Sequence, residues 1–185
     1  MDLKTDAEIV ANVLKGDVQS YALLIEAYKG PVFNLAFRMT GSYSDADDLT
    51  QETFIRAYQR LQQFDQDKKY FTWLYTISIN LIRNHLKKKA RDVANHTTDR
   101  QFPELQTKGD ESGEEVLLSE DSMRRLDENM QKLPVDLREA IILKFYQDLT
   151  FEEVAAITGD SLSAVKMRVY RGLEKLKQLM EVIKL

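Results

Sequence analysis

An acidic segment without hydrophobic periodicity divides this 185-residue chain into two amphipathic parts. The segment, DVANHTTDRQFPELQTKGDESGEEVLLSED at 92–121, holds nine acidic residues and two basic ones. Because like charges repel and small polar side chains bury little apolar surface, this composition predicts a flexible tether. We therefore expect a first domain at 1–93, an acidic linker at 94–118 and a second domain at 119–185.

Both parts are predicted to be helical. Seven Gly and three Pro leave few sites for tight turns, which favours an all-α fold. Asp17 and Ser44 are the expected N-caps of two helices, and Thr150 and Glu153 have capping-box spacing. The apolar period predicts helices at about 5–15, 17–40, 44–63 and 72–90, and then at about 119–132, 135–147, 151–157 and 162–182.

The residue types present argue against several classes of protein. Without cysteine, the chain has no disulfide, thiolate zinc site or thiol nucleophile. His85 and His96 are the two histidines, and no Gly-rich phosphate loop is present, so we predict no enzyme and no cofactor. Asp45, Asp47 and Asp48 diverge around a helix, so no metal site is expected. No membrane-spanning run or signal peptide is recognisable, which predicts a cytoplasmic protein.

The stretch FTWLYTISINLIRNHLKKKAR at 71–91 forms an amphipathic helix with an unusual polar side. Its apolar side is predicted to contain Leu74, Tyr75, Ile77, Ile79, Leu81, Ile82 and Leu86. The opposite side lacks acids and collects Trp73, Thr76, Asn80, Arg83, Asn84, Lys87 and Arg91. Bases and amides bind phosphates and base edges, and an exposed indole stacks on an unpaired base. A nucleic-acid surface is the first interpretation, extended by Lys68 and Lys69; a solvated basic helix with Trp73 in the core is the alternative.

A second surface is predicted on the preceding helix, in DADDLTQETFIRAYQRLQQF at 45–64. One side is expected to pack through Ala46, Thr50, Phe54, Ala57, Tyr58 and Leu61. The other side sets one apolar residue among polar and acidic ones, namely Asp48, Gln51, Glu52 and Ile55. An apolar side chain in such a setting indicates a protein docking site. A single exposed apolar residue without a partner is the alternative.

The C-terminal part has the pattern of a helix-turn-helix, LTFEEVAAITGDSLSAVKMRVYRGLEKLKQLM at 149–180. The second helix is predicted to bury Val165, Val169, Leu173, Leu176 and Met180 and to expose Ser163, Lys166, Met167, Tyr170, Arg171 and Lys177. Such side chains suit the major groove, where bases contact guanine and apolar atoms contact thymine methyls. A helical hairpin that binds no DNA is the alternative. Arg124, Arg125 and Arg138 are either further phosphate contacts or ordinary surface residues.

Three segments together resemble the extracytoplasmic-function (group IV) sigma factors of bacterial RNA polymerase. They are DADDLTQETFIRAYQ at 45–59, FTWLYTISINLIRN at 71–84 and LPVDLREAIILKFYQDLTFEEVAAITGDSLSAVKMRVYRG at 133–172. Their order and spacing agree with that family, and the resemblance covers nearly the whole chain except the linker. It implies sigma domain two, an acidic linker and sigma domain four, and a role in transcription initiation.

The resemblance also implies partners for each surface. Asp48, Gln51, Glu52 and Ile55 would dock on the clamp helices of the largest polymerase subunit. The −10 element would be opened and its non-template strand held by Lys68, Lys69, Trp73, Thr76, Asn80, Arg83, Asn84 and Lys87. The −35 element would be read by Ser163, Lys166, Met167, Tyr170 and Arg171, and the same domain would touch the flap of the second-largest subunit. An anti-sigma factor is a further expected partner.

Two departures from the family pattern prevent the transfer of a promoter sequence. The recognition helix begins Ser163-Ala164-Val165 where many relatives have Gly-Thr-Val, and Asn84 stands where an Asp is frequent. A stand-alone transcription regulator remains the competing interpretation, although it leaves the setting of Ile55 and the position of Trp73 unexplained.

Overall fold

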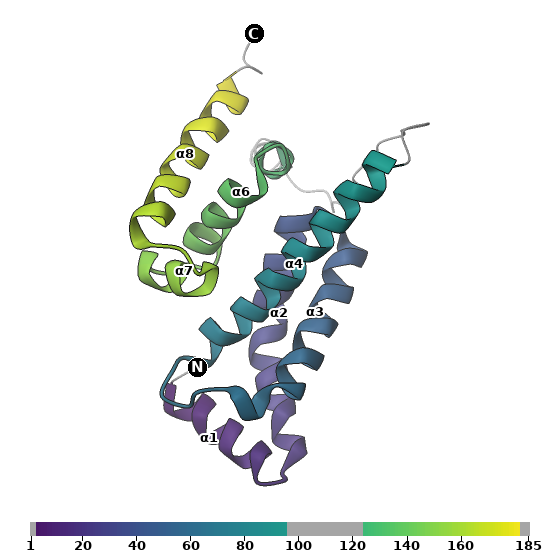
Figure 1. Cartoon of the computed structure of the whole chain (residues 1–185), viewed down its shortest axis with the longest axis vertical. Coiled ribbons are helices and arrows are strands. Elements are labelled where there is room, and N and C mark those ends of the chain that lie inside the picture. Colours follow the sequence, from purple (N-terminus) through teal and green to yellow (C-terminus); the bar gives the residue numbers. More distant parts are fainter. Residues whose placement is uncertain (1–2, 96–123, 182–185) are drawn as a thin grey trace, which may run out of the picture.

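The computed structural model describes residues 3–95 and 124–181, and every regular element in these ranges is helical, which confirms the all-α expectation. The N-terminal part contains α1 (Leu3–Leu14), the short turn η1 (Val18–Ser20), α2 (Tyr21–Thr40), α3 (Tyr43–Gln59), η2 (Leu61–Gln63) and α4 (Tyr70–Asn95). Figure 1 shows α2, α3 and α4 side by side along the long axis, with α1 at one end. The predicted linker at 94–118 lies almost entirely outside the described residues.

The core of the N-terminal part is built from the apolar stripes of these helices. Leu74, Ile79 and Ile82 of α4 are fully buried, as the helical period predicted. They pack with Val10 of α1 and Leu35 of α2 in one cluster of buried residues. Fully burying one such aliphatic side chain contributes about 1.5–3 kcal/mol. The polar side of α4 is thereby fixed outward.

Helix starts differ from two sequence expectations. Ser42, not Ser44, caps α3, because its hydroxyl accepts from the backbone N–H of Asp45 at 3.3 Å. The reason is Gly41, whose left-handed conformation (φ 68°) ends α2 and leaves Ser42 extended. Asp17 precedes the 3-10 turn η1 and makes no side-chain cap to the backbone, so α2 itself begins at Tyr21.

The C-terminal part contains a helical segment at 124–131, α6 (Val135–Ile141), a π-helical turn η3 (Ile142–Tyr146), α7 (Phe151–Thr158) and α8 (Leu162–Glu181). The predicted capping box starts α7. The hydroxyl of Thr150 accepts a hydrogen bond from the backbone N–H of Glu153, and the Glu153 carboxylate accepts one from the backbone N–H of Thr150. Gly159 (φ 74°) then ends α7 and allows the turn into α8. The expected helix-turn-helix is present.

The buried stripe of α8 differs from the predicted one. Val165, Val169 and Leu176 are buried, but Leu173 is 38% exposed and Gly172 takes its place. A Cβ at Gly172 would lie 2.7 Å from Ile141 Cδ1 and 3.3 Å from a carbonyl oxygen of α6. The missing side chain therefore lets α8 approach α6 more closely than a leucine would. Met180 is also exposed, at 39%.

The two parts of the chain pack against each other. Tyr75 of α4 donates to the Gln147 side-chain oxygen at 2.8 Å, and Gln147 donates to the Pro31 carbonyl of α2 at 3.3 Å. Arg38 of α2 pairs with Asp127 at 2.6 Å, and its guanidinium lies 3.8 Å from the ring centre of Tyr146. The helices accordingly lie with α7 beside α4, and with α6 and η3 beside α2 (Figure 1).

Candidate nucleic-acid interface

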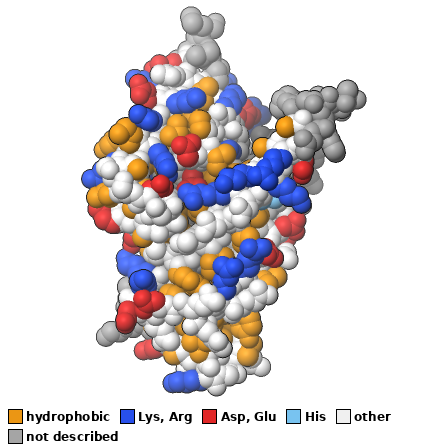
Figure 2. Space-filling model, viewed as in Figure 1, with side chains coloured by type: hydrophobic (Ala, Val, Ile, Leu, Met, Phe, Trp, Pro, Cys, Tyr) orange, Lys and Arg blue, Asp and Glu red, His pale blue; other side chains and the backbone are white. Residues whose placement is uncertain are grey.

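The polar side of α4 is cationic and largely accessible. Asn80, Asn84 and Lys87 are exposed, whereas Thr76 and Arg83 are half-buried. Figure 2 shows Lys and Arg side chains in a row over the upper part of α4, extending toward the C-terminal part. Before the helix, Lys68 and Lys69 are exposed, and Lys68 lies 3.5 Å from Asp65. The exposed residues of the predicted surface are thus Lys68 and Lys69 before the helix and Asn80, Asn84 and Lys87 along it.

Trp73 is not the freely exposed indole that the helical wheel indicated. It is half-buried, with its ring 5.3 Å from that of Phe64 and 5.7 Å from that of Tyr70. Tyr70 and Phe64 belong to the core, so this aromatic cluster fixes the indole at the border between core and surface. The helical wheel missed this because the packing ring of Phe64 lies before the helix.

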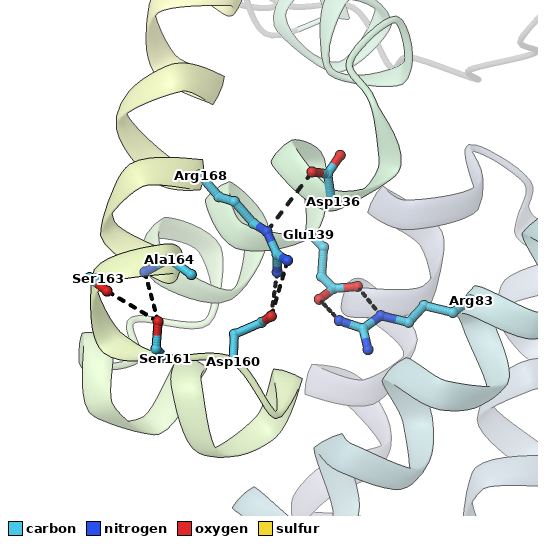
Figure 3. A network of polar contacts seen from close by, with 8 residues as sticks. All are labelled: Arg83, Asp136, Glu139, Asp160, Ser161, Ser163, Ala164 and Arg168. Carbon is cyan, nitrogen blue, oxygen red and sulfur yellow. Dashed lines mark hydrogen bonds and ion pairs between the residues drawn. The ribbon is translucent and has the colours of Figure 1, made fainter.

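Arg83 is held by a carboxylate of the other part of the chain. Its Nε donates to Glu139 Oε2 at 2.8 Å and its Nη2 to Glu139 Oε1 at 2.6 Å, a two-point pair seen in Figure 3. The Glu139 side chain is only 1% exposed. The hydrogen bonds from Arg83 to Glu139 raise the pKa of the guanidinium against the opposing effect of burial, and Asp160 adds to the increase.

Lys69 is held in the same way. Its ammonium lies 2.6 Å from the carboxylate of Glu153 on α7. Burial tends to raise the pKa of Glu153, but hydrogen bonds from Lys69 and Thr150 outweigh it and lower the pKa overall. Lys68, Lys69 and Arg83, three of the eight residues predicted to contact the −10 strand, are therefore ion-paired within the chain, and the last two pair with the C-terminal part.

Within the described residues, the predicted recognition face of α8 has no such ion pair. All five of its predicted DNA contacts are exposed: Ser163, Lys166, Met167, Tyr170 and Arg171. Tyr170 is 64% and Met167 is 52% exposed, which is unusual for large side chains without a partner. The ammonium of Lys166 lies 5.7 Å from the ring centre of Phe151, which ties α8 loosely to α7.

Arg168 is a structural residue that the sequence reasoning missed. It pairs with Asp160 in the turn, with one N–O distance of 3.0 Å, and lies 3.9 Å from the Asp136 carboxylate of α6 (Figure 3). Ser161 adds an N-cap by accepting from the Ala164 N–H at 3.3 Å. Together they fix the angle at which α8 leaves the turn. The sequence signal for this pair was an acidic residue in the turn followed by an Arg two helical turns later.

Arg138 proves to be part of the interior. It is 6% exposed and donates to the side chain of Gln131, and burial lowers its pKa. Both alternatives considered for it, a phosphate contact and an ordinary surface residue, are wrong in this conformation. Arg124 and Arg125 are exposed at the start of the described C-terminal part.

The predicted docking surface on α3 has the expected exposure. Asp48 and Gln51 are exposed and Ile55 is 52% exposed, while Glu52 pairs with Arg56 at 2.5 Å. The opposite side of α3 is buried through Ala46, Thr50, Phe54 and Ala57. Tyr58, expected on the buried side, remains 41% exposed.

Asp45, considered above as a metal ligand, is occupied by α4. Its carboxylate accepts from Lys89 at 2.9 Å and lies 3.2 Å from His85 Nε2. Burial tends to raise the Asp45 pKa, but Lys89 and His85 lower it overall.

Within 3–95 and 124–181, no cluster of three or more potential metal-ligating side chains occurs. None of the helices in these ranges has the length and hydropathy of a membrane span.

Comparison with known proteins supports one family for both parts. The family Sigma-70 region 2 matches residues 24–92, and Sigma-70, region 4 matches residues 123–176. The ECF RNA polymerase sigma factor SigW of Bacillus subtilis is 32% identical over 175 residues, which cover 91% of this chain and 93% of that protein. The ECF RNA polymerase sigma-E factor of Escherichia coli is 34% identical over 179 residues, with 92% and 91% covered.

Solved structures agree with this grouping. CnrH, determined in complex with the cytosolic domain of CnrY, shares 25% identity and a TM-score of 0.69 over 98% of this chain and 99% of that one. The sigma factor RpoE of Bartonella quintana, determined with the anti-sigma factor NepR, has the same fold, with a TM-score of 0.72 at 22% identity over 89% of this chain and 98% of that one. The chain therefore belongs to the extracytoplasmic-function family of RNA polymerase sigma factors.

Proposed function

We propose that this sigma factor joins core RNA polymerase through α3 and presents α8 to the −35 element and α4 to the −10 element of a promoter. The observation that carries the proposal is the exposed recognition face of α8, which follows the Gly159 turn within the segment matched by sigma-70 region 4 and has no ion-pair partner in the part of the chain that the structure describes. The domain limits 1–93 and 119–185 and the individual DNA contacts remain predictions.

At the −35 element, the geometry favours insertion of the N-terminal half of α8 into the major groove. Lys166 and Arg171 supply donors for guanine, and Met167 supplies apolar contact for a thymine methyl. Arg168 and Ser161 act as positioning residues, because they fix α8 to the turn and leave the outward side chains free. Because the helix is already oriented in the free chain, little free energy is lost in ordering it when DNA binds.

At the −10 element, α4 and the loop before it would hold separated strands. Disrupting DNA stacking requires about 1.4 kcal/mol per base-pair step. A base stacked on an aromatic side chain contributes about 1–3 kcal/mol, and Trp73 lies on the same side of this helix as the exposed Asn80 and Lys87. Stacking of this size offsets the free energy of separating only a few base pairs, so promoter opening would require polymerase as well.

Docking to polymerase is assigned to α3. Ile55 stands 52% exposed beside Asp48 and Gln51, and burying it in an interface would remove apolar surface from water. We also propose control by an anti-sigma factor, in keeping with the relatives solved with NepR or with the cytosolic domain of CnrY. Such a partner would cover these same surfaces.

The test is run-off transcription by core RNA polymerase on a promoter library, with and without this protein. We expect transcripts whose start sites depend on the protein. The Ile55→Asp variant should give none of these transcripts and should no longer retain core enzyme in a pull-down. Val93→Asp, another exposed apolar position, is the matched control. A stand-alone regulator would bind DNA tightly without polymerase and would retain its activity in Ile55→Asp, and either result would refute the proposal.

A further inference from the structure

The aromatic cluster around Trp73 continues into the interior of the N-terminal part. Tyr70, the first residue of α4, is 1% exposed, and its ring centre lies 5.7 Å from that of Trp73 and 5.4 Å from that of Phe64. The ring centre of Tyr28, on α2, lies 5.6 Å from that of the same Tyr70. The position of the half-buried indole therefore depends on a ring that α2 helps to hold.

Tyr28 is in turn fixed by α1. Its hydroxyl donates to Asp6 Oδ2 at 2.5 Å, and Asp6 is 4% exposed. Burial raises the pKa of Tyr28, and the bond to Asp6 and the Asp6 charge raise it further, so this hydroxyl stays protonated and remains a donor. Helix α1 crosses the end of the bundle at which α4 begins (Figure 1). A series of contacts thus runs from Asp6 on α1 through α2 to Trp73 on α4.

The buried carboxylate of Asp6 is difficult to explain by stability alone. Its Oδ1 has no hydrogen-bond partner among the residues that the structure describes. A buried acidic group with one donor is unfavourable, and apolar residues of similar size in place of such a pair often stabilise a protein. What the bond from Tyr28 to Asp6 does supply is direction, because it fixes the Tyr28 ring that packs against Tyr70.

We propose that Asp6 and Tyr28 act as positioning residues, which hold the indole of Trp73 in the orientation that stacks on an unpaired base of the −10 strand. They act through the Tyr70 ring, and Asp6 is too deeply buried to contact DNA itself. The proposal rests on the function proposed above and extends it to α1, because Asp6 precedes the segment 24–92 that matches Sigma-70 region 2. If α1 only stabilised the fold, its variants would lose stability without a specific effect on the indole.

The orientation of the indole is directly measurable, because Trp73 is the single tryptophan of the chain. Emission is excited at the long-wavelength edge of the absorption, where tyrosine contributes little, and quenching by acrylamide is measured in the free protein. Asp6→Ala removes the acceptor, and we expect emission at longer wavelength and stronger quenching, because the indole becomes more accessible. Asp6→Asn keeps an acceptor oxygen for the Tyr28 hydroxyl and should restore the parent values. Glu8→Ala removes an exposed acid from the same helix and is the matched control.

A reciprocal variant tests the same hydrogen bond from its other end. Tyr28→Phe removes the donor and preserves the ring, so it should shift the emission in the same direction as Asp6→Ala. It also keeps the test available should Asp6→Ala fail to fold. Urea titration of each variant establishes that the fluorescence is recorded on folded protein.

The effect on promoter opening is measured with core polymerase, by permanganate reactivity of thymines near −10. We expect Asp6→Ala and Tyr28→Phe to lower this reactivity about fivefold, the factor that corresponds to weak stacking of one base. Asp6→Asn and Glu8→Ala should open the promoter as the parent does, and all four variants should retain core enzyme in a pull-down.

Two results would overturn the proposal. One is parent-like indole emission in both Asp6→Ala and Tyr28→Phe, and the other is altered emission together with full promoter opening. Loss of core binding in the folded variants would also contradict it, since that loss would indicate a general structural role. The fluorescence is recorded without polymerase, so failure of the proposed sigma function would appear separately, as absent run-off transcripts with the parent protein.

Discussion

The cationic surfaces of α4 and α8 have similar compositions but different availability. On α8, Lys166 and Arg171 face outward beside Met167 and Tyr170 and have no acidic partner in the described ranges. On α4 and its loop, Arg83 and Lys69 are neutralised by Glu139 and Glu153. The two helices would therefore meet DNA under different conditions. In this structure the predicted α8 contacts are exposed, whereas two cations of the α4 surface are paired with the C-terminal part.

This difference also shows what a charged helix face does and does not reveal. The number of basic residues on a face predicts its attraction for phosphate. Whether that charge is available depends on side chains that are distant in sequence, such as Glu139, which lies 56 residues from Arg83.

The largest effect is expected from charge reversal on the free helix. Lys166→Glu replaces a donor in the major groove by an acid, and a good base contact is worth about 1–3 kcal/mol. With repulsion added, transcription from a −35-dependent promoter should fall on the order of 100-fold in a run-off assay with core polymerase. Lys175→Glu, exposed and farther along α8, should have little effect. A large loss of thermal stability in Lys166→Glu would show instead that this residue is structural.

Next in size is the packing that supports α8. Gly172→Leu puts a side chain where even a Cβ would lie 2.7 Å from the buried Ile141, and overpacking of this kind costs about 1–3 kcal/mol. The free energy of unfolding, measured by urea titration, should fall by about 2 kcal/mol. Glu174→Leu places the same side chain at an exposed position of α8 and should change stability little. Equal stability of the two variants would contradict the close approach of α6 and α8.

A smaller effect is expected on the α4 side. Trp73→Ala removes one stacking surface worth about 1–3 kcal/mol, so open complexes should decrease about tenfold, measured by permanganate reactivity of thymines near −10. Core-polymerase binding should stay unchanged, because Trp73 is on α4 and the docking surface is on α3. Since the indole also packs on Phe64, Trp73→Phe serves as the control that preserves an aromatic ring. Full opening by Trp73→Ala would assign the indole to the core alone.

The smallest effect is a pH dependence of the turn before α8. Burial opposes the shift, but hydrogen bonding to Arg168 and the charges of Arg168 and Arg83 lower the Asp160 pKa below its ordinary value of 3.8. The ionised carboxylate therefore stabilises the fold above this value, and the contribution is lost as pH falls through the lowered pKa. Urea titrations at pH 6 and pH 3 should show a larger acid-induced loss in the parent than in Asp160→Asn. Identical losses would mean that the Arg168 pair contributes nothing.

Local pattern predicted the helices and most buried faces well. The stripe of Leu74, Ile77 and Ile79 is buried as expected, because the helical period determines which side of a helix packs. The same helical period wrongly predicted that Leu173 is buried in place of Gly172, because periodicity carries no information on how closely two backbones approach. Ser44 was predicted as the N-cap of α3 in place of Ser42, because the position of the cap depends on where Gly41 ends the previous helix.

Tertiary partners were beyond reach of the same reasoning. The half-burial of Trp73 depends on Phe64 in the preceding turn, and the burial of Arg138 depends on its bond to Gln131. The outward side chains of α8 and α3 were identified correctly, since exposure follows directly from periodicity. The pairs that join α4 to the C-terminal part were not, because charge complementarity between distant helices leaves no local signal.

The central claim is that two different helices read two promoter elements when the protein is bound to polymerase. Its most direct test is a DNase I footprint of the polymerase complex on one promoter, made with the parent, Lys166→Glu, and an Asn80→Ala/Lys87→Ala pair. The account predicts that Lys166→Glu loses protection only around −35 and the α4 pair loses it only around −10. Loss of both regions with either variant, or full protection by the protein without polymerase, would contradict it.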